Sequence, residues 1–183
     1  MRVIGGSAKG QRLTSLPGDN TRPTMDRVKE SIFNMIQLHV PDAVVLDLFA
    51  GSGALGVEAL SRGGKYCYFV DDFRGSFQVI NENLTKTKLS PKAKVLLMDF
   101  RRGLKNLEHA SVDLIFLDPP YQKEFLPEAL ELIEKDGLLA PGGLIVIEQD
   151  KKETLTVPAT GFVLWKEKKY GNTVVRILKA AEQ

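Results

Sequence analysis

The sequence that decides the fold is Val44-Val45-Leu46-Asp47-Leu48-Phe49-Ala50-Gly51-Ser52-Gly53-Ala54-Leu55-Gly56. The apolar run over 44–49 predicts a buried strand, and the glycines after it predict a tight turn into a helix through Leu55 and Leu60. They satisfy the pattern Gly-x-Gly-x-x-Gly, in which the backbone approaches a ligand and the N–H groups at the helix start face an anion. That anion is either the pyrophosphate of a nicotinamide cofactor or the methionine carboxylate of S-adenosylmethionine. The glycines alone fit both ligands, and they also fit a plain strand-to-helix turn.

Strands and helices alternate on the carboxyl side of this motif. The apolar and amphipathic patterns predict strands over 66–70, 95–98, 112–117 and 144–147, with helices over 73–84 and 125–133. Apolar strands between amphipathic helices predict an α/β fold whose mostly parallel sheet is covered on both faces. The last part of the chain differs, because 162–165 and 173–178 are joined by a short polar segment, 168–172, and predict an antiparallel hairpin.

The amino-terminal part has a different character. A short glycine-rich hairpin is predicted around Gly5-Gly6-Ser7-Ala8-Lys9-Gly10, with little core of its own. A helix capped by Thr24 follows, with one apolar face and an end at Pro41. We therefore expect a basic arm over 1–24 and one domain over 25–183.

The composition excludes several classes of protein and of site. The 183 residues predict one core, and the lone Cys67, predicted to be a buried strand thiol, excludes a disulfide framework. With His39 and His109 far apart, no metal site is expected. The absence of an apolar leader or a membrane span predicts a cytoplasmic protein with no membrane partner. The net charge is only +2, but Lys and Arg outnumber acidic residues by six to two in 1–29 and by seven to three in 151–183. Such basic ends suit a polyanion, although they also suit ordinary solvated lysines.

Carboxylates follow two of the predicted strands. Asp71 lies twenty residues after Gly51, where a carboxylate can accept hydrogen bonds from both ribose hydroxyls of a cofactor, and the next residue, Asp72, could replace it. Asp99 is a candidate partner for an adenine amino group, with Phe100 packed on the ring. Capping of a helix is a nearly equal alternative for Asp99.

The motif that separates the possible chemistries is Asp118-Pro119-Pro120-Tyr121. An exocyclic amine of a nucleic-acid base is a poor nucleophile because its lone pair is delocalised into the ring. An acceptor such as Asp118 against its N–H bonds frees that lone pair and stabilises the charge that develops. Pro119 can hold out its carbonyl as a second acceptor, and Tyr121 offers a stacking face next to Pro120. A structural Asp-Pro-Pro turn is the competing interpretation.

The chain resembles the bacterial 16S ribosomal RNA guanine-N2 methyltransferase family, which acts on the guanine numbered 966. The resemblance rests on matching segments throughout the chain, which are 2–6, 22–29, 33–34, 46–56, 58–63, 83–84 and 118–121. It implies a Rossmann-like class I methyltransferase fold with seven strands and an antiparallel carboxyl-terminal hairpin. It further implies S-adenosyl-L-methionine as cofactor and 16S rRNA of the small ribosomal subunit or its assembly intermediate as partner, with a monomer favoured.

The resemblance and the motifs together give a set of candidate site residues. The catalytic candidates are Asp118, Pro119 and Tyr121, and the cofactor-binding candidates are Phe49, Gly51, Gly53, Asp71, Asp99 and Asp118. The substrate-binding candidates are Arg2, Lys9, Arg12, Arg22, Pro120 and Tyr121. Arg27 ranks below Arg22, because it can pair with Asp26 or a cofactor carboxylate instead.

Two departures from the family pattern concern the cofactor. Members usually carry Glu at position 71, followed by a basic or polar residue, and an alanine-rich helix start where this chain has Phe73-Arg74-Gly75-Ser76.

Three other functions remain open. A nicotinamide oxidoreductase would leave the Asp-Pro-Pro-Tyr motif unused, and a non-catalytic RNA-binding assembly factor could lose it. An amino-methyltransferase acting on another RNA or DNA base is compatible with the motif.

Overall fold

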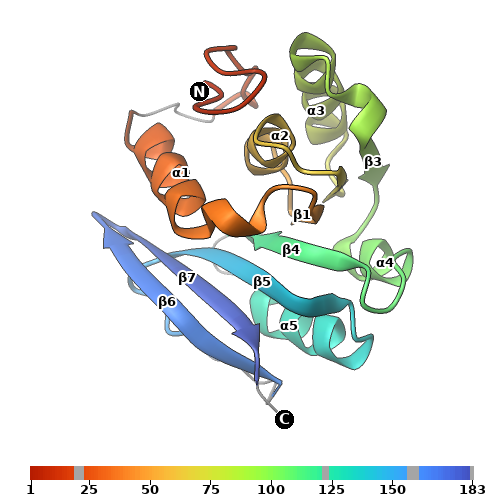
Figure 1. Cartoon of the computed structure of the whole chain (residues 1–183), viewed down its shortest axis with the longest axis vertical. Coiled ribbons are helices and arrows are strands. Elements are labelled where there is room, and N and C mark those ends of the chain that lie inside the picture. Colours follow the sequence, from red (N-terminus) through yellow and green to blue (C-terminus); the bar gives the residue numbers. More distant parts are fainter. Residues whose placement is uncertain (19–22, 121–123, 156–160, 182–183) are drawn as a thin grey trace.

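The computed structural model describes residues 1–18, 23–120, 124–155 and 161–181. Two predicted site residues, Arg22 and Tyr121, lie outside these ranges. The described chain forms a central sheet flanked by helices on both faces (Figure 1). None of the helices in these ranges is long and apolar enough to cross a membrane.

The secondary structure follows the predicted alternation. The strands are β1 (Val44–Leu48), β2 (Tyr66–Asp71), β3 (Ala93–Leu97), β4 (Val112–Leu117), β5 (Leu139–Asp150), β6 (Phe162–Tyr170) and β7 (Thr173–Ala180). The α-helices are α1 (Pro23–Ile36), α2 (Ala54–Ser61), α3 (Arg74–Thr87), α4 (Phe100–Lys105) and α5 (Phe125–Lys135), and short 3₁₀ turns cover Gln37–His39 and Ser90–Lys92.

The seven strands lie in the order β3-β2-β1-β4-β5-β7-β6. Strands β1 to β5 pair in parallel, whereas β7 pairs antiparallel with both β5 and β6. The predicted α/β sheet with its antiparallel carboxyl-terminal hairpin is therefore confirmed. Because the parallel strands all end at one edge, the polar residues that follow β1, β2 and β4 are brought together there.

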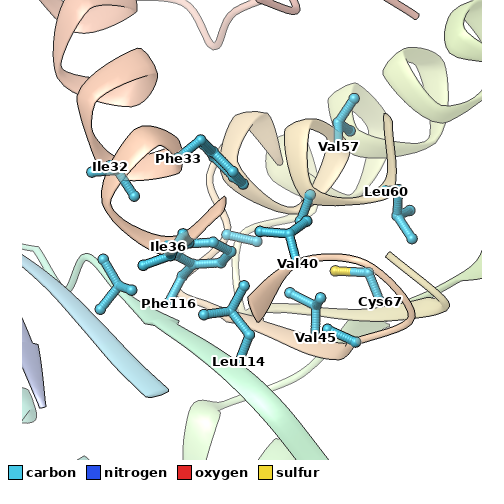
Figure 2. Close-up of a cluster of buried hydrophobic side chains, with 14 of the residues drawn as sticks. Ile32, Phe33, Ile36, Val40, Val45, Val57, Leu60, Cys67, Leu114 and Phe116 are labelled. Carbon is cyan, nitrogen blue, oxygen red and sulfur yellow. The ribbon is translucent and has the colours of Figure 1, made fainter. Parts of the chain in front are cut away.

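Two layers of buried side chains hold the helices to the sheet. Figure 2 shows Ile32, Phe33 and Ile36 of α1 packed over Phe116 of β4. The same layer includes α2 and α3, while the opposite face of the sheet is covered by α4 and α5. Cys67 lies in the first layer and is fully buried, as predicted, and burial raises the pKa of its thiol.

Some local predictions are wrong. Helix α1 begins at Pro23, so Thr24 lies inside the first turn instead of capping it, and the α-helix ends at Ile36, several residues before Pro41. Proline's fixed φ makes it suited to a first helical position.

The predicted connection of the carboxyl-terminal hairpin, 168–172, is too long. Strand β6 ends at Tyr170 and β7 begins at Thr173, so only two residues lie in the turn. A two-residue turn suffices because Gly171 adopts φ 55°.

The amino-terminal hairpin is closed by a bridge between Arg2 and Arg12. Its side chains Val3, Ala8 and Leu13 are buried in the layer that contains α1 and α2. The hairpin therefore adds to the core of the sheet domain and is fixed against it.

Candidate active site

A pocket of about 470 Å³ lies at the carboxyl edge of the parallel strands. Residues that follow β1, β2, β3 and β4 line it, together with Glu148 near the end of β5. Open α/β sheets bind ligands at this edge. Of the predicted site residues, the pocket brings together Phe49, Gly51, Asp71, Asp99, Asp118 and Pro120.

The glycines of the first loop have different structural roles. Gly51 lines the pocket with φ 57°, and a Cβ built on it would meet no atom within 4 Å, so its bare face borders open space. Gly53 has φ 77°, and its Cβ would approach the Ile80 and Phe69 side chains at 3.1 and 3.2 Å. Gly53 is not among the described lining residues and serves the packing of the loop. The loop therefore approaches a ligand at Gly51.

Asp71 connects the first two strand ends. Its Oδ2 accepts the Gly51 N–H at 2.9 Å, and its Oδ1 accepts the Phe73 N–H at 2.9 Å. Each carboxylate oxygen retains a further lone pair, so Asp71 can still accept from a ligand. Asp72 also lines the pocket and is exposed. Asp71 thus shapes the glycine loop in addition to facing the pocket, a role that its spacing from Gly51 did not reveal.

Asp99 caps a helix and also lines the pocket. Its Oδ1 accepts the Arg101 N–H at 2.9 Å at the start of α4, which confirms the capping alternative, and its Oδ2 pairs with the Arg101 guanidinium at 3.0 Å. The same guanidinium lies 4.4 Å from the centroid of the Phe100 ring and pairs with Glu128 of α5. Asp99 is therefore held rigidly at the pocket wall.

Three phenylalanine rings form an apolar part of the pocket. The Phe49 ring lies 5.0 Å from Phe100 and 6.1 Å from Phe125, to which it is nearly parallel. The separation of Phe100 and Phe125 is 5.3 Å. Phe49 has φ 66°, a conformation unusual for a residue with a side chain. The surrounding fold holds the strand end in this conformation and directs the Phe49 ring into the cluster.

Asp118 and Pro120 follow β4 and are exposed at the pocket. Pro119 lies between them and is partly buried, and it is not among the described lining residues. Asp118 therefore lines the pocket with an exposed side chain.

The described lining is strongly acidic. Its carboxyl side chains are Asp47, Asp71, Asp72, Asp99, Asp118 and Glu148, and its single basic side chain is that of Lys29. Burial raises the pKa of Asp47 to about 8, with the charge of Asp71 adding to the shift and a hydrogen bond from the Gly56 N–H opposing it. Burial also raises the pKa of Glu148. Even with the Asp47 carboxyl protonated at neutral pH, the other acidic side chains outnumber Lys29, so the lining favours a cationic ligand over the anionic pyrophosphate of a dinucleotide.

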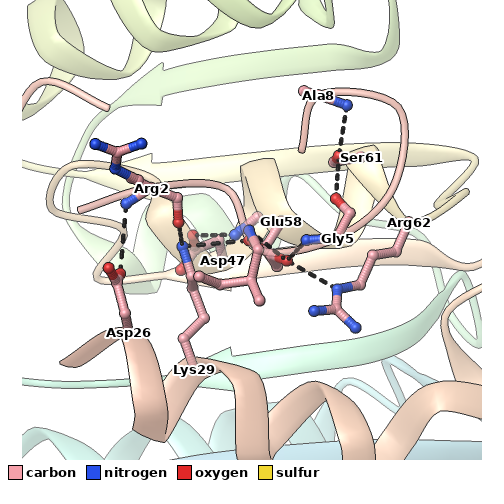
Figure 3. Close-up of polar contacts among 11 residues, drawn as sticks. Arg2, Gly5, Ala8, Asp26, Lys29, Asp47, Glu58, Ser61 and Arg62 are labelled. Carbon is pink, nitrogen blue, oxygen red and sulfur yellow. Dashed lines mark hydrogen bonds and ion pairs between the residues drawn. The ribbon is translucent and has the colours of Figure 1, made fainter. Parts of the chain in front are cut away.

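The amino-terminal hairpin and α1 supply a pocket wall that sequence reasoning missed. Met1, Ser15 and Leu16 come from the hairpin region, and Met25 and Lys29 come from α1. Glu58 of α2 joins the hairpin to α1, because its carboxylate accepts the Ile4 and Gly5 N–H groups and pairs with Lys29 at 3.2 Å. Figure 3 shows Glu58 between Gly5 and Lys29. The sequence feature that could have indicated this contact was a glutamate within the mostly apolar helix 54–61.

The predicted RNA-binding residues of the hairpin lie outside the described pocket lining. The side chains of Arg2, Lys9 and Arg12 are exposed, and none of them lines the pocket. Arg27 of α1 is also exposed, and among the described residues it has no ion-pair partner, so the suggested pair with Asp26 is not formed. These exposed cationic side chains of the hairpin and α1 therefore do not line the acidic pocket.

Comparison with known proteins gives one consistent assignment. A family model described as "Conserved hypothetical protein 95" matches residues 1–179. The protein YlbH of Bacillus subtilis is 44% identical over 182 residues, covering 98% of both chains. Ribosomal RNA small subunit methyltransferase D of Escherichia coli is 36% identical, covering 100% of this chain and 91% of its own. The solved structure of yhhF from Escherichia coli superimposes with a TM-score of 0.87 at 32% identity, covering 100% of this chain and 99% of the other.

Proposed function

This chain belongs to the family described as "Conserved hypothetical protein 95", and from that premise we propose that it transfers a methyl group from S-adenosylmethionine to the exocyclic N2 of a guanine in 16S rRNA. The guanine at position 966 is the proposed target, and the substrate is the small ribosomal subunit or its assembly intermediate. The proposal places the enzyme in the cytoplasm, where its substrate is assembled, and favours a monomer.

The observation that carries the proposal is an acidic pocket that ends at Asp118. S-adenosylmethionine has a sulfonium and an ammonium group against one carboxylate, so it is a net cation. It suits a lining in which acidic side chains outnumber the one basic side chain even when the Asp47 carboxyl is protonated. A nicotinamide dinucleotide would bring its pyrophosphate against the same carboxyls. The acidic lining therefore favours the methyl donor, which the glycine pattern alone could not do.

The chain offers partners for each part of this cofactor. The open face of Gly51 and the amino terminus of α2 suit the methionine carboxylate, because backbone N–H groups there point outward. Asp71 suits the ribose hydroxyls, with Asp72 beside it. Asp99 and the Phe100 ring suit the adenine. When bound, the cofactor supplies an electrophilic methyl group.

The chain's own contribution to the reaction lies after β4. Asp118 accepts an N–H of the guanine amine, keeps the nitrogen lone pair available and stabilises the positive charge that develops. The Pro119 carbonyl is the second acceptor. Tyr121 stacks on the base, with Pro120 completing that surface. Arg2, Lys9, Arg12 and Arg22 bind phosphates of the surrounding RNA.

The test is methylation of small subunits that lack the modification, with labelled S-adenosylmethionine and mapping of the labelled base. Asp118→Ala should lower kcat by roughly 10² or more with little change in cofactor affinity, because it removes an interaction that strengthens in the transition state. Tyr121→Ala should weaken engagement of the base by roughly 1 to 3 kcal/mol, and Tyr121→Phe should be mild because it keeps the ring. Full activity of Asp118→Ala, or binding of NAD in place of S-adenosylmethionine, would contradict the proposal.

A further inference from the structure

The tip of the β6–β7 hairpin lies at the same edge of the sheet as Asp118. Leu117, the last residue of β4, pairs with Ile147 of β5, and β5 continues to Asp150, which pairs with Thr173 of β7. Thr173 in turn pairs with Tyr170 at the end of β6. The tip therefore projects beyond the carboxyl end of the strand that carries the Asp-Pro-Pro motif.

The spacing between these points suits a nucleic-acid strand. Strands β5 and β7 lie between β4 and β6, so three inter-strand spacings separate β4 from β6 by about 14 Å. The three steps from Ile147 to Asp150 add about 10 Å along the strand. The tip then lies about 17 Å from the end of β4, as the diagonal of these two steps. At about 3.4 Å per nucleotide along a helical strand, that distance corresponds to roughly five nucleotides.

Four exposed lysines surround this tip. Lys168 and Lys169 come from β6, and Lys151 and Lys152 come from the turn after β5. The Lys151 N–H donates to the carbonyl of Asn172 at 2.7 Å, so the two segments are fixed side by side. We refer to Lys151, Lys152, Lys168 and Lys169 as the tip lysines.

The tip is braced against α1. The Tyr170 and Ser31 hydroxyls are hydrogen-bonded, and the Lys168 Nζ lies 3.4 Å from the Ser31 Oγ and 5.4 Å from the centroid of the Tyr170 ring. Arg27 lies one helical turn before Ser31 on the same side of α1 and is exposed. Lys168 thus connects the tip to the helix whose Met25 and Lys29 line the pocket.

Neighbouring acidic groups are already engaged within the fold. The Asp150 Oδ1 accepts the Lys152 backbone N–H at 2.8 Å, and Glu153 accepts from the Gln149 amide at 3.2 Å. Glu167 pairs with Arg176 at 2.8 Å. No ion pair joins any of the tip lysines to a carboxylate in the described part of the chain. Within these ranges no carboxylate therefore neutralises the tip lysines, and Lys168 is held beside Ser31 and Tyr170.

We propose that the tip lysines and Arg27 form an RNA-docking surface that binds the phosphates of nucleotides flanking the target base. The inference rests on the proposed function and adds a second contact region, formed by the opposite end of the chain from the amino-terminal hairpin. Because the tip is braced at a fixed distance from Asp118, docking there would help to set which base reaches the pocket.

The test is a double charge reversal, Lys168→Glu with Lys169→Glu. Its matched control is Lys65→Glu with Lys94→Glu, since both of these lysines are exposed and lie in or next to β2 and β3 at the far side of the sheet. Binding of a synthetic RNA fragment containing the target guanine, binding of S-adenosylmethionine and methylation of unmodified small subunits are measured for each protein.

The tip variant should bind the RNA fragment at least about tenfold more weakly, with the slope of log K against log salt reduced by about 1.4, because two phosphate contacts are lost. Cofactor affinity should not change, and the control should match the wild type. The variant Lys168→Arg with Lys169→Arg keeps both positive charges and should bind the RNA fragment as tightly as the wild type. RNA affinity equal to that of the control would overturn the inference. Weaker methylation of small subunits with unchanged affinity for the RNA fragment would also overturn it and would indicate a ribosomal protein as the partner. A wild type that binds the RNA through the tip but methylates nothing would refute the proposed function alone.

Discussion

Both ends of the chain form basic hairpins, yet they are held to the sheet domain by different forces. The carboxyl-terminal hairpin joins the sheet through continuous backbone pairing of β7 with β5 and β6. The amino-terminal hairpin has one internal bridge, between Arg2 and Arg12, and lies outside the sheet. Backbone pairing spreads the attachment of the second hairpin over many residues. The first hairpin is attached by its buried apolar side chains Val3, Ala8 and Leu13 and by a few buried polar side chains of the neighbouring helices.

Those side chains come from α2 and α3. Glu58 is fully buried and accepts from the Ile4 and Gly5 N–H groups, and Ser61 accepts the Ala8 N–H at 2.9 Å while donating to the Gly5 carbonyl. Asn83 accepts the Thr14 N–H at 2.7 Å and donates to the carbonyls of Thr14 and Ser52. Each anchor satisfies hairpin groups that burial has removed from water, so each is costly to remove.

The largest expected effect is that of Glu58→Ala. It leaves the buried Lys29 without its carboxylate and the Ile4 and Gly5 N–H groups without an acceptor, which should cost about 3 to 5 kcal/mol in the free energy of unfolding. Chemical denaturation measures this loss. Cofactor affinity should also fall, because Met1 and other hairpin residues line the pocket.

The matched control for this prediction is Glu82→Ala. Glu82 pairs with Lys86 and accepts the Thr14 hydroxyl, but the Glu82 and Lys86 side chains are about half exposed, so the loss should be much smaller than for Glu58→Ala. Equal losses for the Glu58 and Glu82 variants would show that the hairpin is not held by the buried carboxylate.

The same contrast explains what the sequence could predict. Apolar strands and their alternation with helices identified the sheet, and the residue types after β1, β2 and β4 identified the pocket edge, because both signals are local and periodic. The role of Glu58 is not local. It depends on contacts with residues more than fifty positions away, and no spacing rule links such positions. For the same reason the sequence treated the hairpin as an arm that binds RNA and missed its place in the pocket wall.

The sequence also contained too little information to predict α4 and the separate roles of the two loop glycines. Helix α4 spans only six residues, too few to show a helical period, and only its cap, Asp99, gave a signal. The glycine pattern predicted the turn, but it could not distinguish Gly51, which borders the pocket, from Gly53, which packs against Ile80. That distinction depends on the neighbours that the fold supplies.

A smaller effect is expected from Asn83→Ala. The substitution leaves the Thr14 N–H without an acceptor and the Thr14 and Ser52 carbonyls without a donor, which should cost about 1 to 3 kcal/mol in the free energy of unfolding. The control is Asn81→Ala on the same helix, since Asn81 is exposed and bonds only within its own helix, to the Phe77 carbonyl. If the two variants lose equal stability, Asn83 does not anchor the hairpin to the glycine loop.

The smallest effect should come from Glu167→Gln in the carboxyl-terminal hairpin. Glu167 pairs with Arg176 across β6 and β7, but its side chain is 34% exposed, and Arg176 keeps a second hydrogen bond, to the Gln149 side chain at 2.8 Å. The pair should therefore contribute no more than about 1 kcal/mol, and the backbone bonds between the strands remain. Thermal unfolding of this variant should resemble that of the wild type, and its RNA affinity should be equal or slightly higher, because a negative charge beside the tip lysines is removed. A loss of more than about 2 kcal/mol, beyond the range of an exposed pair, would mean that this hairpin too depends on a single side chain, and the contrast between the two ends of the chain would fail.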